Sequence, residues 1–235
     1  GSYRLIESAR QAGVQYFVFS STAAVYGEPE EVPIVETAKL QPTNVYGRTK
    51  LMIEEMLYDY SAIYGSTYVA LRYFNAAGAD ESGNIGEDHS PETHLIPLVL
   101  EAALKKRPHI TVFGTDYDTS DGTCIRDYIH VTDLASAHVL AMNYLINGGG
   151  SRAFNLGSGN GFSVKDIIET AKNVTKIDIP VEYGERRVGD PSTLIASSEC
   201  IKDVLGWKPQ HSELSQIIGD AWHWHQSHPK GYDDK

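Results

Sequence analysis

The sequence has 235 residues, of which 41% are hydrophobic and 22% are charged, and these values are typical of a folded globular protein. It carries 31 acidic and 20 basic residues, a formal net charge of -11. That balance, without an extended basic run, argues against nucleic acid and membrane partners. No apolar stretch is long enough to span a bilayer. Cys124 and Cys200 lie far apart and match no metal spacing, so we expect a reducing, cytoplasmic setting.

Predicted helices and strands alternate along the chain. A helix at residues 3–12 precedes a strand at 16–19, and a helix at 43–64 precedes a strand at 68–74. Later strands are predicted at residues 110–113, 153–156, 181–183 and 194–196, and later helices at 95–106, 131–146, 163–173, 198–205 and 212–225. This order predicts an α/β protein with a Rossmann-like, doubly wound, mostly parallel sheet.

Polar residues follow two of the predicted strands. Thr22 comes just after the strand at residues 16–19, and Asn75 directly follows the strand at 68–74. Parallel sheets bind ligands outside the carboxyl ends of their strands, so both residues are candidates for a site. The polar loop that begins near Gly78 indicates a boundary. We therefore predict a Rossmann-like domain at residues 1–78 and mainly a smaller lobe at 79–235, with some segments returning to the first domain.

The sharpest local pattern is Tyr46-Gly-Arg-Thr-Lys50. Residues four apart share one face of a helix. An ammonium group beside a phenol favours the phenolate by Coulomb attraction, which makes the tyrosine a plausible base near neutral pH. A short pattern of this kind also recurs by chance on exposed helices.

The residues before this helix make the pattern more specific. Thr22 lies 24 residues before Tyr46, at a predicted strand end, where its hydroxyl can bond the oxygen that the tyrosine deprotonates. Taken alone, Ser20-Ser-Thr22 also fits a polar turn. Thr22 followed by Tyr46 and Lys50 behind an apolar strand resembles the catalytic set of the short-chain dehydrogenase/reductase superfamily.

Further segments resemble the extended, nucleotide-sugar-modifying branch of that superfamily, and within it the UDP-galactose (UDP-glucose) 4-epimerase family. They are Phe19 to Gly27, Leu71 to Asn75, Gly122 to Asp133, Arg186 to Asp190, Trp222 to Trp224 and His228 to Tyr232. The resemblance therefore runs from end to end of the chain.

This resemblance implies a reaction at C4 of a UDP-sugar. Tyr46 would accept the proton of the 4-hydroxyl, Thr22 would orient that oxygen, and Lys50 would favour the phenolate and bond the nicotinamide ribose. Tightly held NAD would accept the hydride and return it to the opposite face of the sugar, which interconverts UDP-galactose and UDP-glucose. The cofactor-binding residues would be Thr22, Tyr46, Lys50, Tyr73 and Phe74.

The resemblance also implies a nucleotide site. Arg126 and Arg187 would hold the diphosphate, because guanidinium groups pair well with phosphate oxygens, and Asp190 would take the ribose hydroxyls. The uracil would be lined by Thr111, Val112 and Phe113. The remaining substrate-binding residues would be Thr22, Ala23, Ala24, Tyr46, Asn75, His94, Leu95 and Leu194. Taken singly, Arg126 could instead pair with its neighbour Asp127, and Phe113 could belong to the core.

Residue types at three places bear on the type of reaction, the choice of sugar and the binding of a metal. Dehydratases of this branch carry Thr-Asp-Glu where this chain has Thr22-Ala23-Ala24, and two alanines supply neither the acid nor the base that elimination needs. Leu194 stands at the family's gatekeeping position and is intermediate in size, which leaves activity on UDP-N-acetylgalactosamine open. An epimerase of another UDP-sugar, a UDP-N-acetylhexosamine or a UDP-pentose, is the alternative. No metal site is expected, because His223 and His225 point to different faces of a helix and no third ligand accompanies His228.

The family's glycine-rich turn, which approaches the NAD pyrophosphate at a helix N-terminus, has no counterpart here. The glycines between Gly157 and Gly161 lack the G-x-G-x-x-G spacing and fit a turn. Residues 1–78 are therefore interpreted as the remainder of an NAD-binding Rossmann domain, and we expect this chain to be catalytically incomplete. The alternative is a non-catalytic UDP-sugar-binding module.

The resemblance finally implies a homodimer that forms through the helix at residues 43–64. The apolar residues Leu51, Met52 and Leu57 fit this role. They fit packing within one chain equally well.

Overall fold

The computed structural model describes residues 1–187 and 189–232, which form two compact units. The first unit consists of Gly1–Phe74, Leu134–Gly159 and Ala196–Lys208. The second consists of Asn75–Asp133, Asn160–Ile195 and Pro209–Lys235. Each unit is thus assembled from three separate stretches of the chain.

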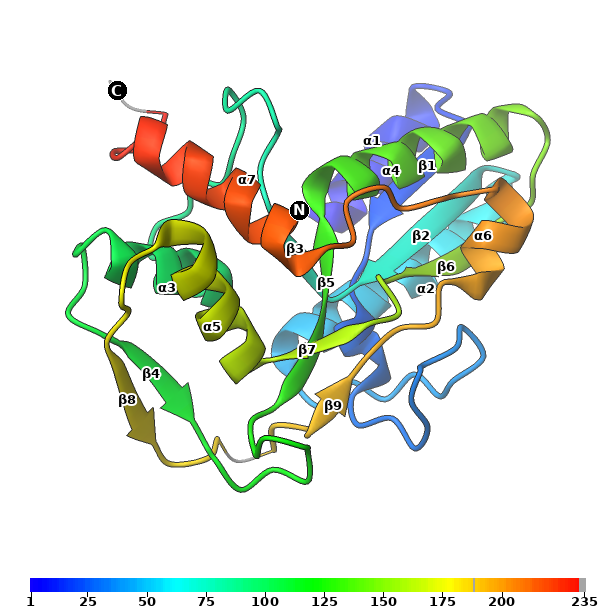
Figure 1. The fold of residues 1–235 in the computed structure, drawn as a ribbon. Helices are drawn as coiled ribbons and strands as arrows, with labels where there is room; N and C mark the ends of the chain where they lie inside the picture. The colour runs from blue at the N-terminus through cyan, green and yellow to red at the C-terminus, as the bar shows by residue number, and fades with distance from the viewer. Residues whose placement is uncertain (188, 233–235) are drawn as a thin grey trace. The chain divides into compact units, whose positions relative to one another are not determined.

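The first unit is built on a parallel sheet of three strands in the order β1-β2-β6 (Figure 1). These strands are β1 (Tyr16–Ser20), β2 (Thr67–Tyr73) and β6 (Arg152–Leu156). Its helices are α1 (Ser2–Gln11), the 3-10 helix η1 (Ala23–Tyr26), α2 (Val45–Tyr64), the part of α4 (Val131–Ile146) from Leu134 on, and α6 (Glu199–Leu205). The central strand is the most apolar, and Val69, Ala70 and Leu71 are fully buried.

The second unit contains a sheet of mixed direction and a strand pair. In the sheet, β5 (Ile125–His130) pairs in parallel with β3 (Asn75–Ala77) and β9 (Thr193–Leu194), and antiparallel with β7 (Gly161–Ser163). The pair is β4 (Ile110–Phe113) with β8 (Val181–Gly184), in parallel. The helices α3 (Leu95–Ala103), α5 (Val164–Thr175) and α7 (Leu214–Ser227) share one apolar core, which includes Leu100, Ile167 and Ile217.

The predicted α/β class with mostly parallel strands is confirmed, while several strands of the second unit were not predicted. The strand β5 carries Arg126, Asp127 and His130 in its sequence, and this polar pattern hides it from a search for apolar runs. The helix predicted at residues 95–106 ends earlier, at Ala103. Lys105 then takes a positive φ of 60°, a conformation that an α-helix cannot include.

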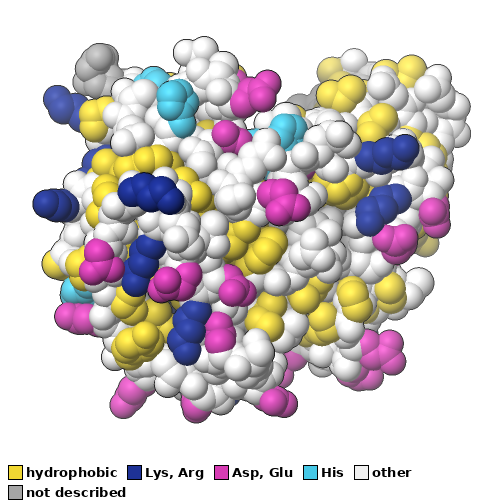
Figure 2. All heavy atoms as spheres, in the orientation of Figure 1, with side chains coloured by type: hydrophobic (Ala, Val, Ile, Leu, Met, Phe, Trp, Pro, Cys, Tyr) yellow, Lys and Arg dark blue, Asp and Glu magenta, His cyan; other side chains and the backbone are white. Residues whose placement is uncertain are grey.

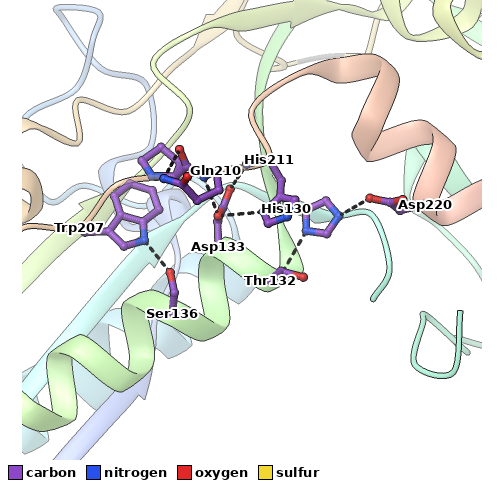
Figure 3. Close-up of polar contacts among 9 residues, drawn as sticks. His130, Thr132, Asp133, Ser136, Trp207, Gln210, His211 and Asp220 are labelled. Carbon is purple, nitrogen blue, oxygen red and sulfur yellow. Dashed lines mark hydrogen bonds and ion pairs between the residues drawn. The ribbon is translucent and has the colours of Figure 1, made fainter. Parts of the chain in front are cut away.

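Asp133 and His130 form a polar cluster where β5 ends (Figure 3). The Asp133 carboxylate accepts hydrogen bonds from the backbone N–H groups of Gln210 and His211, both at 2.9 Å. The ring of His211 stacks on His130 with ring centroids 4.8 Å apart. The backbone N–H of Thr132 donates to His130 Nδ1 at 3.1 Å, so His130 carries its proton on Nε2, which lies 3.2 Å from Asp220.

The surface agrees with the acidic but mixed composition. On the face drawn in Figure 2, Lys and Arg side chains are spread among Asp and Glu side chains rather than gathered in one area. Over the part of the chain that the structure describes, none of the helices combines the length and apolarity needed to cross a membrane.

Candidate active site and nucleotide pocket

The catalytic pattern predicted from sequence lies at the start of α2. Asn44 caps this helix, and its side chain accepts a hydrogen bond from Gly47 N at 2.7 Å. A Cβ atom at position 47 would lie 2.5 Å from the carbonyl oxygen of Ala24. Glycine at this position therefore lets the first turn of α2, which carries Tyr46, pack directly against η1.

Thr22 is held at the other side of this contact. It is the N-cap of η1, and its hydroxyl accepts a hydrogen bond from Ala24 N at 3.1 Å. Ala23 is buried beside it. The segment Thr22–Ala24 and the start of α2 thus form one packed corner, which follows the carboxyl end of β1.

Lys50 is anchored at the end of β1. Its Nζ donates to the carbonyl oxygen of Ser20 at 2.9 Å and lies 5.7 Å from the centroid of the Tyr46 ring. Partial burial lowers the pKa of the Lys50 ammonium. The phenol of Tyr46 is 57% exposed, so it is available to a bound molecule.

This corner fits one end of a dinucleotide cofactor. An ammonium group has three N–H donors, and Lys50 gives one of them to Ser20. The others are suited to the hydroxyls of a ribose. Tyr73, the last residue of β2, and Phe74 after it are both half-buried at the carboxyl end of the neighbouring strand.

A buried ionic network lies behind this corner in the same unit. Arg72 on β2 makes a bidentate pair with Glu54 on α2, with Nε–Oε1 and Nη2–Oε2 distances of 3.1 and 2.6 Å. Glu54 also accepts a short hydrogen bond from the hydroxyl of Ser21. Arg72 donates to the hydroxyl of Tyr26, which donates in turn to Asn155 at 2.7 Å. The network joins α2, β2, η1, β6 and the residue after β1, and sequence reasoning did not find it.

The second unit holds a pocket of about 290 Å³. It collects eight of the residues predicted to bind the substrate: Asn75, His94, Leu95, Thr111, Phe113, Arg126, Arg187 and Asp190. Asn75 is fixed by a hydrogen bond from its Nδ2 to the carbonyl oxygen of Asp127 at 2.9 Å. The pocket thus brings together side chains from β3, β4, β5 and the segment after β8.

Charged groups are concentrated at one part of this pocket. Arg126 pairs with Asp190 at 2.5 Å and also donates to the carbonyl of Pro191 at 2.8 Å. The hydroxyl of Tyr117 lies 3.1 Å from Asp190, and burial together with that carboxylate raises the pKa of Tyr117 to about 12. The guanidinium of Arg187 lies over the ring of Phe113, 4.3 Å from its centroid.

Six predicted substrate-binding residues lie outside the pocket lining. Thr22, Ala23, Ala24 and Tyr46 belong to the first unit, and Val112 and Leu194 belong to the second. Val112 points into the apolar core of the second unit, because alternate residues of a strand face opposite sides. Leu194 lies on β9, where it pairs in register with Arg126.

Several lining residues were not predicted. Cys124 and Tyr128 line the pocket together with Arg126, at the two-residue spacing that places side chains on one face of an extended segment. Recognising β5 as a strand would have identified them. Burial raises the pKa of the Cys124 thiol. Arg107 also lines the pocket, and its Nε and Nη1 atoms are buried without a hydrogen-bond partner among the described residues.

Residues 1–157 match the family model described as the NAD dependent epimerase/dehydratase family. The chain is a member of the NAD-dependent epimerase/dehydratase family. A curated member of this family, the UDP-glucose 4-epimerase of Streptococcus mutans, is 55% identical over 235 residues, which is 100% of this chain and 71% of that protein. The resemblance stated from the sequence is thereby confirmed.

Solved structures of UDP-glucose 4-epimerases support the same family assignment. A UDP-glucose 4-epimerase from Brucella ovis in complex with NAD is 48% identical, with a TM-score of 0.93 over 95% of this chain and 69% of that one. A UDP-glucose 4-epimerase from Bifidobacterium longum in complex with NAD+ and UDP is 37% identical, with a TM-score of 0.92 over 98% of this chain and 69% of that one. The Rossmann-like class predicted for the chain is that of its epimerase relatives.

Proposed function

We propose that this chain carries the catalytic residues and nucleotide pocket of a UDP-glucose 4-epimerase, which interconverts UDP-galactose and UDP-glucose. The observation that carries the proposal is the corner of Thr22, Tyr46 and Lys50 at the carboxyl end of β1. It occurs in a chain whose curated relatives of that name match it along its whole length. Such a corner places a phenol and an ammonium group where parallel sheets bind their ligands.

The residues of the first unit would perform the proton transfer. Tyr46, as phenolate, accepts the proton of the sugar 4-hydroxyl and later returns it. The Lys50 ammonium favours the phenolate by Coulomb attraction, and the Thr22 hydroxyl orients the reacting oxygen. Thr22, Tyr46, Lys50, Tyr73 and Phe74 would hold NAD, which would supply reversible hydride transfer at C4 when bound.

The pocket of the second unit would bind the UDP part of the substrate. Arg126 and Arg187 are suited to the diphosphate, since guanidinium groups bond phosphate oxygens in a fork. Asp190 is suited to ribose hydroxyls as an acceptor. Phe113, beneath Arg187, offers a flat apolar face to the base.

The same residues favour epimerisation over elimination. Ala23 is buried, and neither it nor Ala24 has a titratable group. Loss of water from a sugar needs an acid and a base on neighbouring carbons. Tyr46 alone can serve proton transfer at one carbon.

The test is a coupled assay that supplies UDP-galactose and NAD+ and follows UDP-glucose through UDP-glucose dehydrogenase. It uses a chimera in which this chain replaces the matching 71% of the Streptococcus mutans enzyme, with that enzyme itself as the positive control. We expect turnover by the chimera. A chimera that binds UDP but forms no UDP-glucose would contradict the assignment, and parallel runs with UDP-N-acetylgalactosamine and a UDP-pentose would identify a sibling activity.

We also propose that the protein is a cytoplasmic homodimer that associates through α2. Met52, Tyr58 and Ile63 on this helix are exposed, whereas Leu57 is buried and so belongs to internal packing. Sedimentation of the chimera with Ile63→Glu should show monomers if Ile63 lies in the dimer interface. An unchanged dimer would place the interface elsewhere.

A further inference from the structure

The loop between β3 and α3 in the second unit brings four metal-ligating side chains together. They follow the spacing E-x-H-x-x-E-x-H and are Glu87, His89, Glu92 and His94. One ligand atom from each, two imidazole nitrogens and two carboxylate oxygens, lies within 4.8 Å of all the others. Zn²⁺ holds four ligands tetrahedrally at about 2.0–2.2 Å, which sets the ligand atoms roughly 3.4 Å apart. The most distant pair of the cluster therefore has to close by at most roughly 1.4 Å around an ion.

The side chains converge on one point. His94 Nδ1 lies 2.8 Å from Glu87 Oε1 and 2.9 Å from Glu92 Oε1. His89 Nδ1 approaches the same Glu92 oxygen at 3.5 Å. An imidazole nitrogen carries at most one hydrogen, so His94 Nδ1 can donate fully to only one of the two carboxylates. A divalent cation would neutralise both carboxylates and take a lone pair from each ring.

The backbone around this cluster is held in place by other parts of the unit. The Trp224 indole N–H donates to the carbonyl oxygen of Glu87 at 3.0 Å, and Gly86 packs so closely that a Cβ there would lie 2.2 Å from the indole ring. Glu92 accepts the backbone N–H groups of Thr93 and His94 at 2.6 and 2.7 Å. The ligand atoms are therefore presented by an anchored loop.

We propose that Glu87, His89, Glu92 and His94 form a binding site for a borderline divalent cation such as Zn²⁺. Two imidazoles and two carboxylates suit Zn²⁺ and its first-row neighbours, whereas Mg²⁺ and Ca²⁺ prefer sites made of oxygen alone. Glu92 is 9% exposed in its side chain and His89 is 46% exposed, so the site has a buried floor and an open side through which an ion can enter.

The site has a consequence for the neighbouring pocket. His94 is both a member of the cluster and part of the lining of the nucleotide pocket. A bound cation would hold its ring toward Glu87 and Glu92. The cation is thus positioned to reduce the freedom of one pocket residue.

The experiment is a calorimetric titration of the 235-residue chain with Zn²⁺, repeated with His89→Ala and Glu87→Gln. We expect one ion per chain, and an affinity at least about tenfold weaker in each variant, because even outer partners of metal ligands contribute 10- to 100-fold. His109→Ala is the matched control, since its ring pairs with Glu182 at 3.2 Å outside the cluster. It should bind Zn²⁺ as the wild type does.

A second measurement keeps the result interpretable if a variant folds poorly. Co²⁺ added to the wild-type chain should give the visible absorption of a four-coordinate ion, and Zn²⁺ should displace it. Absence of stoichiometric Zn²⁺ binding by the wild type, or equal binding by the wild type and both cluster variants, would overturn the proposal. Neither readout depends on epimerase activity.

Discussion

The two units of this protein assemble their functional residues in different ways. In the first, Thr22, Tyr46 and Lys50 come from one continuous stretch of chain, and a buried ionic network lies behind them. In the second, the pocket residues come from Asn75 to Asp190, and the main ion pair, Arg126 with Asp190, itself lines the pocket. The first arrangement suits chemistry that needs a fixed group, and the second suits recognition of a large ligand.

The largest expected effect is on turnover, and it separates proton transfer by the first unit from UDP binding by the second. Tyr46→Phe removes the proposed proton acceptor, and general acid–base groups contribute roughly 10²- to 10⁴-fold to rate, so turnover of the chimera should fall by that factor. Binding of UDP, measured by calorimetry, should stay unchanged because the pocket lies in the other unit. Near-normal turnover would remove Tyr46 from the mechanism.

The next effect concerns the network behind the catalytic corner. Arg72→Met leaves the Glu54 carboxylate buried without its partner, and breaking such a pair costs about 3–5 kcal/mol. The free energy of unfolding in urea, followed by circular dichroism, measures this loss. Arg10→Met, which removes a pair with Glu7 on the exposed helix α1, is the control and should change stability little. If Arg72→Met and Arg10→Met lowered the free energy of unfolding equally, the buried pair would contribute no more to stability than an exposed pair.

A smaller effect is expected in the pocket. Arg126→Ala removes a charged donor, and hydrogen bonds to charged groups contribute about 1.5–3 kcal/mol, which corresponds to roughly 10- to 100-fold in affinity. Calorimetry with UDP on the 235-residue chain measures it. Arg4→Ala, on an exposed part of α1, should leave UDP affinity unchanged. If Arg126→Ala left the affinity for UDP unchanged, Arg126 would serve only to pair with Asp190 and would not bind the nucleotide.

The smallest effect is a dependence of stability on pH, and it comes from His130, whose contacts with Asp220 and Thr132 are drawn in Figure 3. Burial and the neighbouring His211 lower the pKa of His130, and they outweigh Asp220 and Asp133, which raise it. The unfolded chain therefore binds a proton near pH 6.5 that the folded chain binds only at lower pH. Stability should fall as the pH drops below about 6.5, by less than about 1.4 kcal/mol per pH unit for this one group.

His130→Asn tests this assignment. Urea unfolding at pH 7 and pH 5 should show a shallower fall in stability for the variant than for the wild type. An identical fall in both would assign the pH dependence to other groups, such as His225, whose pKa burial also lowers.

The contrast between a site from one stretch of chain and a site from several also explains which parts of the fold and the site could be predicted from the sequence. The helix α2 and its Tyr46–Lys50 spacing depend on neighbours in sequence, so local patterns revealed them. The strand β5 did not follow an apolar pattern, because its polar residues are satisfied by distant partners: Arg126 by Asp190 and His130 by Asp220. The Arg72–Glu54 pair was missed for the same reason.

The interleaving of the two units bears on how the protein is synthesised. Domains that occupy continuous stretches fold one after another as they leave the ribosome. Here the first unit lacks its last segment until Lys208 has been made, and the second still requires Pro209–Lys235. The first unit is therefore completed only after much of the second has been made, and β2 gains its second partner strand, β6, only once Leu156 has been made.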